Sequence, residues 1–409
     1  MLRRPTVKQF GPLRLSGFRL LFVSTLASSL GTLLAQIALA IDVKDRTNAG
    51  IWVGAVLVVG FLPTILVGLT LGPLIDRLER RKLMVAADVV RAAVFFALVF
   101  VGSASAIVAL AFVAGLASGF FRPAVYAGVP NLVPEEDLPH ANALLQSVEN
   151  ASWAVGPVIG GLLTAATGPH LAYWINAVSF LVSAVLIARI PARLLQSATA
   201  LTRGHWTDLK DGFRAVLESR TLLAVLLGWG FAGLGIGSIS VSEVFLAKNT
   251  FGAGDFGYGL LFGGIGTGLV VGSFWSSAVQ ARIGLARTYG GAIVVMALGF
   301  GLAAISPNVW VAAACCVVGG VGDGLAIVCN ALLVQTGARD EIRGRALTVL
   351  MSGTMTVQAL GTILAGALMP PDAARWVWGA GALVFLLAAG VGYGLSREPS
   401  RAAAPAPAG

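Results

Sequence analysis

The chain has 409 residues, of which 57% are hydrophobic and only 11% are charged, and its formal net charge is +9. This charged share is about half that of a soluble domain, so the composition excludes a protein whose main solvent is water. The basic residues lie between apolar stretches and are not gathered in one polar domain. They therefore indicate no nucleic-acid partner and are better interpreted as a signal of membrane orientation.

Apolar stretches of about twenty residues follow one another along nearly the whole chain, separated by charged residues and by clusters of Pro, Gly and Asn. Each stretch is long enough to cross roughly 30 Å of hydrocarbon at about 1.5 Å per residue. The sequence therefore predicts an all-α membrane protein with twelve transmembrane helices. We place them near residues 18–41, 51–75, 84–102, 107–130, 143–167, 171–190, 221–246, 258–280, 285–305, 309–334, 346–369 and 376–395.

The longest polar stretch divides these helices into two sets of six. Apolar residues at helical spacing between Trp206 and Ser219 predict an amphipathic helix on the cytoplasmic face within this stretch. Short acidic linkers follow both the fourth and the tenth helix, which indicates pseudo-symmetric halves around a central site. We expect an N-terminal six-helix bundle over residues 1–190, a cytoplasmic linker over 191–220, a C-terminal six-helix bundle over 221–396 and a disordered tail over 397–409.

The loop charges predict which side of the membrane each end faces. Of the 28 Lys and Arg residues, four lie in loops on one side (Lys44, Arg46, Lys248 and Arg375) and two, Arg91 and Arg122, lie well inside helices. The other 22 lie at the termini and in or next to the loops of the opposite side. Because Lys and Arg are retained on the cytoplasmic side, both termini should be cytoplasmic. We expect a monomeric, multi-pass protein of the inner (cytoplasmic) membrane.

Two carboxylates lie toward the outer ends of corresponding helices in the two halves, Asp42 in the first and Glu243 in the seventh. Charges in hydrocarbon are costly, so such residues are candidates for function. We expect both to line the outer half of a cavity, where a carboxyl group can take up a proton and release it when its surroundings change. For Asp42 the alternative is a hydrated helix end that it shares with Lys44, Asp45 and Arg46.

The segment between the second and third helices contains a glycine, an Asp-Arg pair and a basic cluster: Gly72, Asp76, Arg77, Arg80, Arg81 and Lys82. Gly72 would let helix backbones approach closely, and Asp76 would cap the next helix and pair with an Arg. The basic cluster would face anionic lipid or acidic partners. We interpret the segment as a cytoplasmic gate, with Asp88 and Arg91 of the third helix as its partners. The alternative is a loop whose charge only fixes orientation.

Arg122 in the fourth helix and Glu149 in the fifth should lie at the same depth, about 10–12 Å from the cytoplasmic boundary. We expect them to pair, in either a structural or a proton-relay role. The fifth helix also contains Gly156, Pro157, Gly160 and Gly161. Proline removes a helical hydrogen bond and glycines flatten one face, so this segment is a candidate hinge, with an ordinary kinked helix as the alternative.

Asp323 in the tenth helix lies between two glycines in an apolar stretch, and we expect it to reach the cavity. The three histidines all fall in predicted loops, and the three cysteines fall in apolar stretches without metal-ligand spacing. We therefore expect no metal site and no cofactor.

Residues 72–82 resemble the cytoplasmic signature of the major facilitator superfamily, although Glu79 occupies the place of a usual second Gly. The same segment, residues 120–124 (Phe-Phe-Arg-Pro-Ala) and residues 343–345 (Arg-Gly-Arg) resemble the branch that contains enterobactin-type siderophore exporters and macrolide efflux pumps. Gly156-Pro157-x-x-Gly160-Gly161 resembles the antiporter motif of the superfamily, with Ser152 at its first small position. The resemblance implies two six-helix bundles of the major facilitator fold.

We therefore expect a secondary active transporter that exports an amphipathic small molecule, such as a drug, macrolide or siderophore-like metabolite, by proton antiport and alternating access. Its partners would be the small-molecule substrate, protons and membrane lipids. The alternative is a proton-coupled importer of the same fold. A membrane enzyme or sensor is a distant alternative, because the sequence contains no recognisable Ser/His/Asp set, metal cluster or attached soluble domain.

Overall fold

The computed structural model describes residues 8–195, 213–337 and 343–397. These residues contain no strand and include twelve helices of 19 to 32 residues. The first six are α1 (Ser16–Thr47), α2 (Gly50–Arg77), α3 (Arg80–Leu98), α4 (Ala104–Leu132), α5 (Leu138–Thr167) and α6 (Pro169–Ala188). The next six are α8 (Arg220–Phe245), α9 (Gly254–Ile283), α10 (Leu285–Ile305), α11 (Val309–Gly337), α12 (Arg343–Leu368) and α13 (Ala374–Arg397). Short segments between or before them are η1 (Lys8–Arg14), η2 (Glu135–Asp137), η3 (Ala192–Leu194) and η4 (Leu246–Thr250).

Most predicted helices agree with the structure to within a few residues, and α10 begins and ends at the predicted residues. The largest differences concern charged helix ends. Helix α1 continues to Thr47, where Asn48 ends it with a positive φ of 43°. Helix α3 begins at Arg80, because the basic cluster forms its first turn and is not part of a loop.

Ten of the helices are long and apolar enough to cross a membrane. The other two among the described residues are α3, which begins with the basic cluster, and α5, which contains Glu149 and Asn150 in its middle. The predicted all-α membrane fold is therefore confirmed, whereas the count of twelve crossings stays a prediction.

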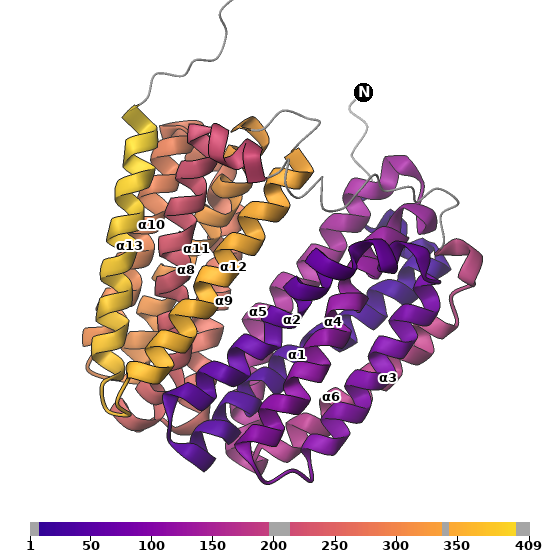
Figure 1. Cartoon of the computed structure of the whole chain (residues 1–409), viewed down its shortest axis with the longest axis horizontal. Coiled ribbons are helices and arrows are strands. Elements are labelled where there is room, and N and C mark those ends of the chain that lie inside the picture. The colour runs from indigo at the N-terminus through magenta and orange to yellow at the C-terminus, as the bar shows by residue number, and fades with distance from the viewer. Residues whose placement is uncertain (1–7, 196–212, 338–342, 398–409) are drawn as a thin grey trace, which may run out of the picture.

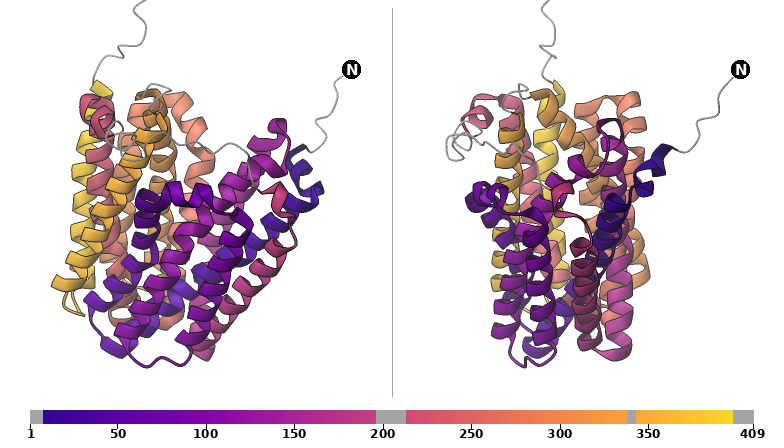
Figure 2. Two further views of the ribbon diagram at one scale, coloured as in Figure 1. Left: turned by 45° about the vertical axis from the view of Figure 1, so that its right-hand side comes forward. Right: turned by 90° about the vertical axis from the view of Figure 1, so that its right-hand side faces the viewer.

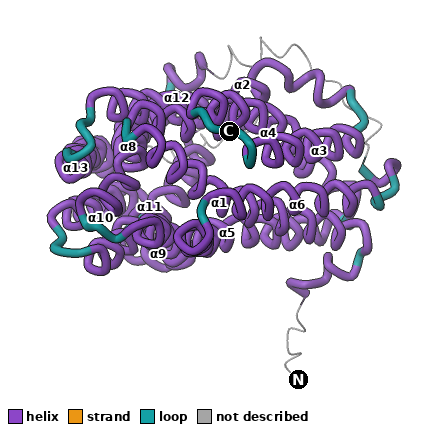
Figure 3. The backbone as a smooth tube through the Cα atoms, turned by 90° about the horizontal axis from the view of Figure 1, so that it is seen from below, coloured by secondary structure: helices purple, strands orange, loops and turns teal. Residues whose placement is uncertain are grey.

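Helices α1 to α6 form one bundle and α8 to α13 form the other (Figure 1). We call the end at which α1 and α8 begin and α13 finishes the inner end, and the opposite end the outer end. The bundles meet toward the outer end and diverge toward the inner end (Figures 1 and 2). Seen from the outer end, α12 lies beside α2 and α9 beside α5 (Figure 3), and these two pairs make the main contacts between the bundles.

We call the contacts of α2 with α12 and of α5 with α9 the outer seams. Glycines form both seams, in the outer halves of the helices. A methyl group added at Gly50 of α2 would lie 2.7 Å from the Gly366 carbonyl oxygen of α12. A methyl group added at Gly161 of α5 would lie 2.8 Å from Gly259 Cα of α9. Backbones this close leave no room for side chains, so the outer end is closed. If the inner end is cytoplasmic, as the loop charges predict, this is an inward-facing arrangement.

Two predicted features fall partly outside the described residues. Within the expected amphipathic helix, residues 206–212 are not described, whereas residues 213–218 are helical, with Val216 buried and Phe213 and Leu217 exposed. Most of the predicted tail, from residue 398 onward, also lies outside the described residues.

Candidate functional site

Asp42 is buried near the outer end of α1 and is fully engaged within its own bundle. It accepts a hydrogen bond from Arg46 Nε at 2.6 Å and one from the Tyr173 hydroxyl of α6 at 2.9 Å. Arg46 also donates to the Gly102 carbonyl between α3 and α4. The bundles meet at this end, so Asp42 is buried here, and its place in an outer cavity stays a prediction. Asp42 ties α1 to the helices around it.

Glu243 lies at a similar level of α8 but in a different environment. Its side chain is among the most buried charged groups, at 1% exposure, and its Oε1 atom has no hydrogen-bond partner. Tyr258 of α9 and Cys316 of α11 lie close enough to interact with its charge. The Tyr258 hydroxyl is also buried without a partner. Glu243, like Asp42, was expected to line an outer cavity; here it is sealed inside the closed outer end.

Asp323 is a second carboxyl group, and it lies nearer the inner end, on α11. It is seven residues after Cys316, so the two side chains share one face of α11 and lie about 10 Å apart along the helix axis. Asp323 is partly exposed, but its Oδ1 atom is buried without a partner, as is Oδ1 of Asn330 one further heptad along. The glycines on either side of Asp323 pack against α10 and α9, which leaves Asp323 between those helices.

The Asp88 and Arg91 side chains form a buried ion pair with each other inside the N-terminal bundle. Asp88 also accepts a hydrogen bond from the Ser183 hydroxyl of α6 at 2.7 Å. The Arg91 guanidinium carbon lies 4.2 Å from the ring centre of Phe121 in α4 and 4.3 Å from that of Phe180 in α6. The cluster therefore joins α3 to α4 and α6 through charge, hydrogen-bonding and cation–π contacts.

Arg122 and Glu149 form the predicted pair, with Nη2 of Arg122 2.8 Å from Oε2 of Glu149. The Tyr126 hydroxyl donates to the other carboxylate oxygen at 3.0 Å. Glu149 is one turn inward from Trp153, whose ring stacks on Phe262 of the other bundle at 5.6 Å between ring centres. The Arg122 side chain is 61% exposed, because the bundles diverge at this level.

The predicted cytoplasmic gate is described only in part. Gly72, Asp76 and Arg77 form the last turns of α2, and their side chains lie outside the described residues. Arg80, expected to face lipid or acidic partners, is instead buried and donates to the carbonyl oxygens of Ala127 and Leu195. It thus links α3 to α4 and to the end of η3.

The other two basic residues of this cluster pair with Glu79, the residue that departs from the usual signature. Lys82 Nζ lies 2.7 Å and Arg81 Nε 3.6 Å from its carboxylate oxygens. The hydrogen bond from Lys82 lowers the pKa of the Glu79 carboxyl below its usual range. The acidic residue therefore offsets part of the positive charge at the start of α3.

The glycines of the antiporter-like segment in α5 divide between two partners. Gly156 and Gly160 pack against Leu33 and Leu34 of α1, within the bundle. Gly161 packs against Gly259 of α9, in the other bundle. The segment therefore connects the core of one bundle to the outer seam, which the sequence motif alone did not indicate.

Three charged residues at the outer end were not among the sequence candidates. Lys248 of η4 donates to Asp45 of α1 at 2.7 Å and also to Asp255 of α9. Lys248 is one of only four basic residues that the charge count assigned to the outer loops. A basic residue retained on that side was the signal that could have identified this group.

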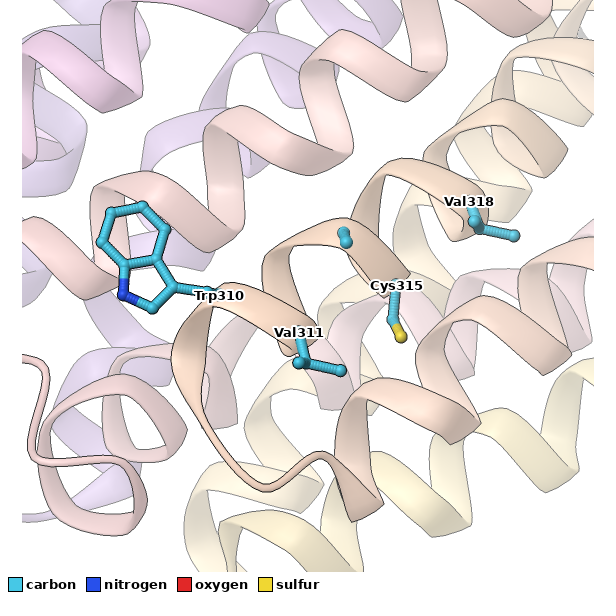
Figure 4. A pocket seen from close by; sticks show the side chains of 5 residues that line it. Trp310, Val311, Cys315 and Val318 are labelled. Carbon is cyan, nitrogen blue, oxygen red and sulfur yellow. The ribbon is translucent and has the colours of Figure 1, made fainter.

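A shallow apolar depression lies on α11 and is lined by Trp310, Val311, Ala314, Cys315 and Val318 (Figure 4). Its lining is almost wholly apolar, and Trp310, Val311 and Val318 are exposed, as expected of a surface that contacts lipid. It presents no charged group to a polar substrate. Within the described residues, no group of three or more His, Cys, Asp or Glu side chains is placed to hold a metal ion.

Comparison with known proteins agrees with this architecture. The chain is 28% identical over 370 residues to the multidrug efflux pump Tap of Mycolicibacterium fortuitum, covering 85% of this chain and 88% of that protein. It is 25% identical over 217 residues to macrolide efflux protein A of Streptococcus pyogenes, covering 51% and 53%.

Among solved structures, a bacterial homologue of the iron transporter ferroportin in an inward-facing state matches with a TM-score of 0.75. It is 19% identical and covers 94% of this chain and 99% of that chain, so the likeness establishes the fold. The model of the family described as transmembrane secretion effector matches residues 7–407. The chain is thus a member of this family of major facilitator transporters, and it is a transporter, not an enzyme.

Proposed function

We propose that this transporter exports an amphipathic small molecule across the cytoplasmic membrane in exchange for protons, by alternating access, with both termini in the cytoplasm. Relatives that are named as multidrug and macrolide efflux proteins support export. The apolar helix interiors favour a lipophilic cargo such as a drug, a macrolide or a siderophore-like metabolite.

The observation that carries proton coupling is the isolation of Glu243. A buried carboxylate is normally paired with a basic group or hydrogen-bonded, because an unpaired charge in a low-dielectric interior is costly. Glu243 has no such partner among the described residues and lies behind the closed outer seam. A residue kept there at a cost to stability is a candidate for binding a proton during transport.

The proposed cycle uses the two ends of the molecule in turn. When the outer seams open, Glu243 becomes hydrated and exchanges a proton with the outside. When they close, Glu243 is sealed and cargo enters from the inner end. Asp323, about 10 Å inward of Cys316 on the same face of α11, is the second carboxyl group through which the proton leaves to the cytoplasm.

The test is transport by purified protein in proteoliposomes, with ethidium and erythromycin as probes. An imposed pH gradient should drive both the movement of a probe and a counterflow of protons. Glu243→Gln should lose the dependence on the gradient. Glu218→Gln, which breaks the exposed Arg214–Glu218 pair in residues 213–218, is the control and should retain it.

Two outcomes would contradict the proposal. Unchanged coupling in Glu243→Gln would exclude this residue as the proton site. Movement of the probe in the same direction as the protons would favour the proton-coupled importer.

A further inference from the structure

An ion pair joins the outer ends of the two bundles, and the proposed proton exchange does not use it. Lys248 Nζ lies 2.7 Å from Oδ2 of Asp45, which belongs to the other bundle, and also binds Oδ1 of Asp255 in its own bundle. The Lys248 side chain is 15% exposed and that of Asp45 is 47% exposed. The bond therefore lies at the rim, between solvent and the buried end of α8.

The local backbone brings Lys248 to both carboxylates. Lys248 lies in η4, a π-helix in which the Phe251 amide bonds the Leu246 carbonyl at 3.0 Å. Gly252 and Gly254 follow, each with a φ of +62°, a conformation that L side chains rarely adopt. The resulting reversal places Asp255, at the start of α9, next to Lys248. A π-helix is rare and is found frequently at functional sites.

Each charge of the pair also has a partner within its own bundle. Lys248 has Asp255, and Asp45 has Lys44, whose Nζ is 3.9 Å away. Separation of the outer ends would break the bond between Asp45 and Lys248 but would leave neither residue without an opposite charge. Such a bond can break and form again at small cost, unlike a buried pair in which one charge would be stranded.

The pair lies nearer the outer end of the molecule than the proposed proton site does. Lys248 is five residues after Glu243, and every residue from 241 to 247 is buried. Lys44 adds a second contact at this level, with Nζ 5.9 Å from the ring centre of Phe245 in the other bundle. Movement of α1 away from η4 would therefore expose the buried outer end of α8, which contains Glu243.

We infer that Asp45, Lys248 and Asp255 form an outer ionic latch. The bond between Asp45 and Lys248 holds the outer ends together in the inward-facing state, and Asp255 retains Lys248 after that bond breaks. The inference rests on the alternating-access part of the proposed function and is independent of which residue carries the proton.

The experiment measures the separation of the outer ends by pulsed electron spin resonance. Spin labels are placed at Ser105 in α4 and Asp372 between α12 and α13, which are exposed residues at the outer ends of the two bundles. The native cysteines Cys315, Cys316 and Cys329 are first replaced by alanine. The protein with an intact latch should show a short and a long distance, whose proportions change with pH or with added erythromycin.

Loss of an exposed ion pair predicts a roughly twofold to fivefold rise in the ratio of the long to the short population for Asp45→Asn and for Lys248→Gln. Asp255→Asn should change the ratio in the opposite direction, because Lys248 then has Asp45 as its main partner. Because Asp45 is half exposed, 1 M NaCl should raise the ratio in the protein with the intact latch but not in Asp45→Asn. Glu218→Gln is the matched control and should leave the ratio unchanged.

The results separate the latch from the transport cycle. A single short distance under all conditions, in protein that still transports, would overturn alternating access at this end and the latch with it. Two distances whose ratio is the same in the intact protein, Asp45→Asn and Lys248→Gln would overturn the latch and leave the proposed function standing. Asp45→Asn and Lys248→Gln test the same bond, so the measurement remains decisive if one of them fails to fold.

Discussion

The two bundles differ in how their membrane-embedded carboxylates are partnered. In the N-terminal bundle, Asp42, Asp88 and Glu149 each have an arginine partner and a hydroxyl donor. In the C-terminal bundle, Glu243 and Asp323 each have a buried oxygen without any partner among the described residues. The first set stabilises contacts between helices. The second set destabilises the fold, and we propose that it is retained for transport.

This comparison predicts that the substitutions that lower stability most are not the ones that impair proton coupling most. A buried, unpaired polar atom costs about 1–3 kcal/mol. Removing an acid of the N-terminal bundle should therefore lower stability, whereas removing one of the C-terminal bundle should mainly affect coupling. Four substitutions test this, in order of decreasing effect on stability.

The largest loss is expected for Asp88→Ala. It leaves Arg91 charged and buried between two aromatic rings, at a cost of about 3–5 kcal/mol. The thermal unfolding midpoint in detergent should fall sharply. Ser183→Ala, which removes only the hydroxyl bonded to Asp88, is the control and should have a smaller effect. Equal midpoints for Asp88→Ala and the unsubstituted protein would show that this cluster does not stabilise the bundle.

A moderate loss is expected for Tyr173→Phe. The change removes one hydrogen bond to the buried Asp42 carboxylate while leaving Arg46 in place, and a bond to a charged group contributes about 1.5–3 kcal/mol. The same thermal measurement checks the change. A midpoint higher than that of the unsubstituted protein would contradict a structural role for the Asp42 cluster.

A small loss is expected for Arg122→Gln. The pair with Glu149 is well formed, but the Arg122 side chain is 61% exposed, and solvent limits such pairs to about 0–1 kcal/mol. Raising the salt concentration should reduce the difference in unfolding midpoint between this variant and the unsubstituted protein. A loss as large as that of Asp88→Ala would mean that the pair is shielded from water.

The smallest loss of stability, or a gain, is expected for Asp323→Asn. The amide is close in shape to the carboxyl and carries no charge to bury, while Oδ1 of Asp323 has no partner to lose. Gradient-driven movement of ethidium in proteoliposomes should nevertheless be lost. A stable variant with normal gradient-driven transport would remove Asp323 from the proposed proton route.

The depth of residues along helices could be predicted from the sequence, because helical rise is constant. That reasoning placed Arg122 and Glu149 at one level, and they form a pair. The similar treatment of Asp42 and Glu243 compared only their positions along the chain, so it did not show that their hydrogen-bond partners differ. Arg46, one turn after Asp42, was a visible sign that Asp42 has a local partner, whereas Tyr173 could not be located without the packing of α6 against α1.

Contacts across the bundles could not be predicted, because they depend on how two separately folded units meet. Lys248 and Asp45 are 203 residues apart, and neither lies in a motif. The close approach of Gly161 to Gly259 was similarly hidden, since the motif in α5 indicated flat helix faces but not which helix each face would meet.

The seams between α5 and α9 and between α2 and α12 consist largely of backbone against backbone. Dispersion contacts of this kind lose much of their strength within the first ångström of separation. Partial opening would therefore sacrifice most of the attraction without yet admitting enough water to replace it. In the proposed cycle, such a junction would favour fully closed and fully separated positions over half-open ones, and one added methyl group at Gly161 or Gly259 would tip the balance toward the separated position.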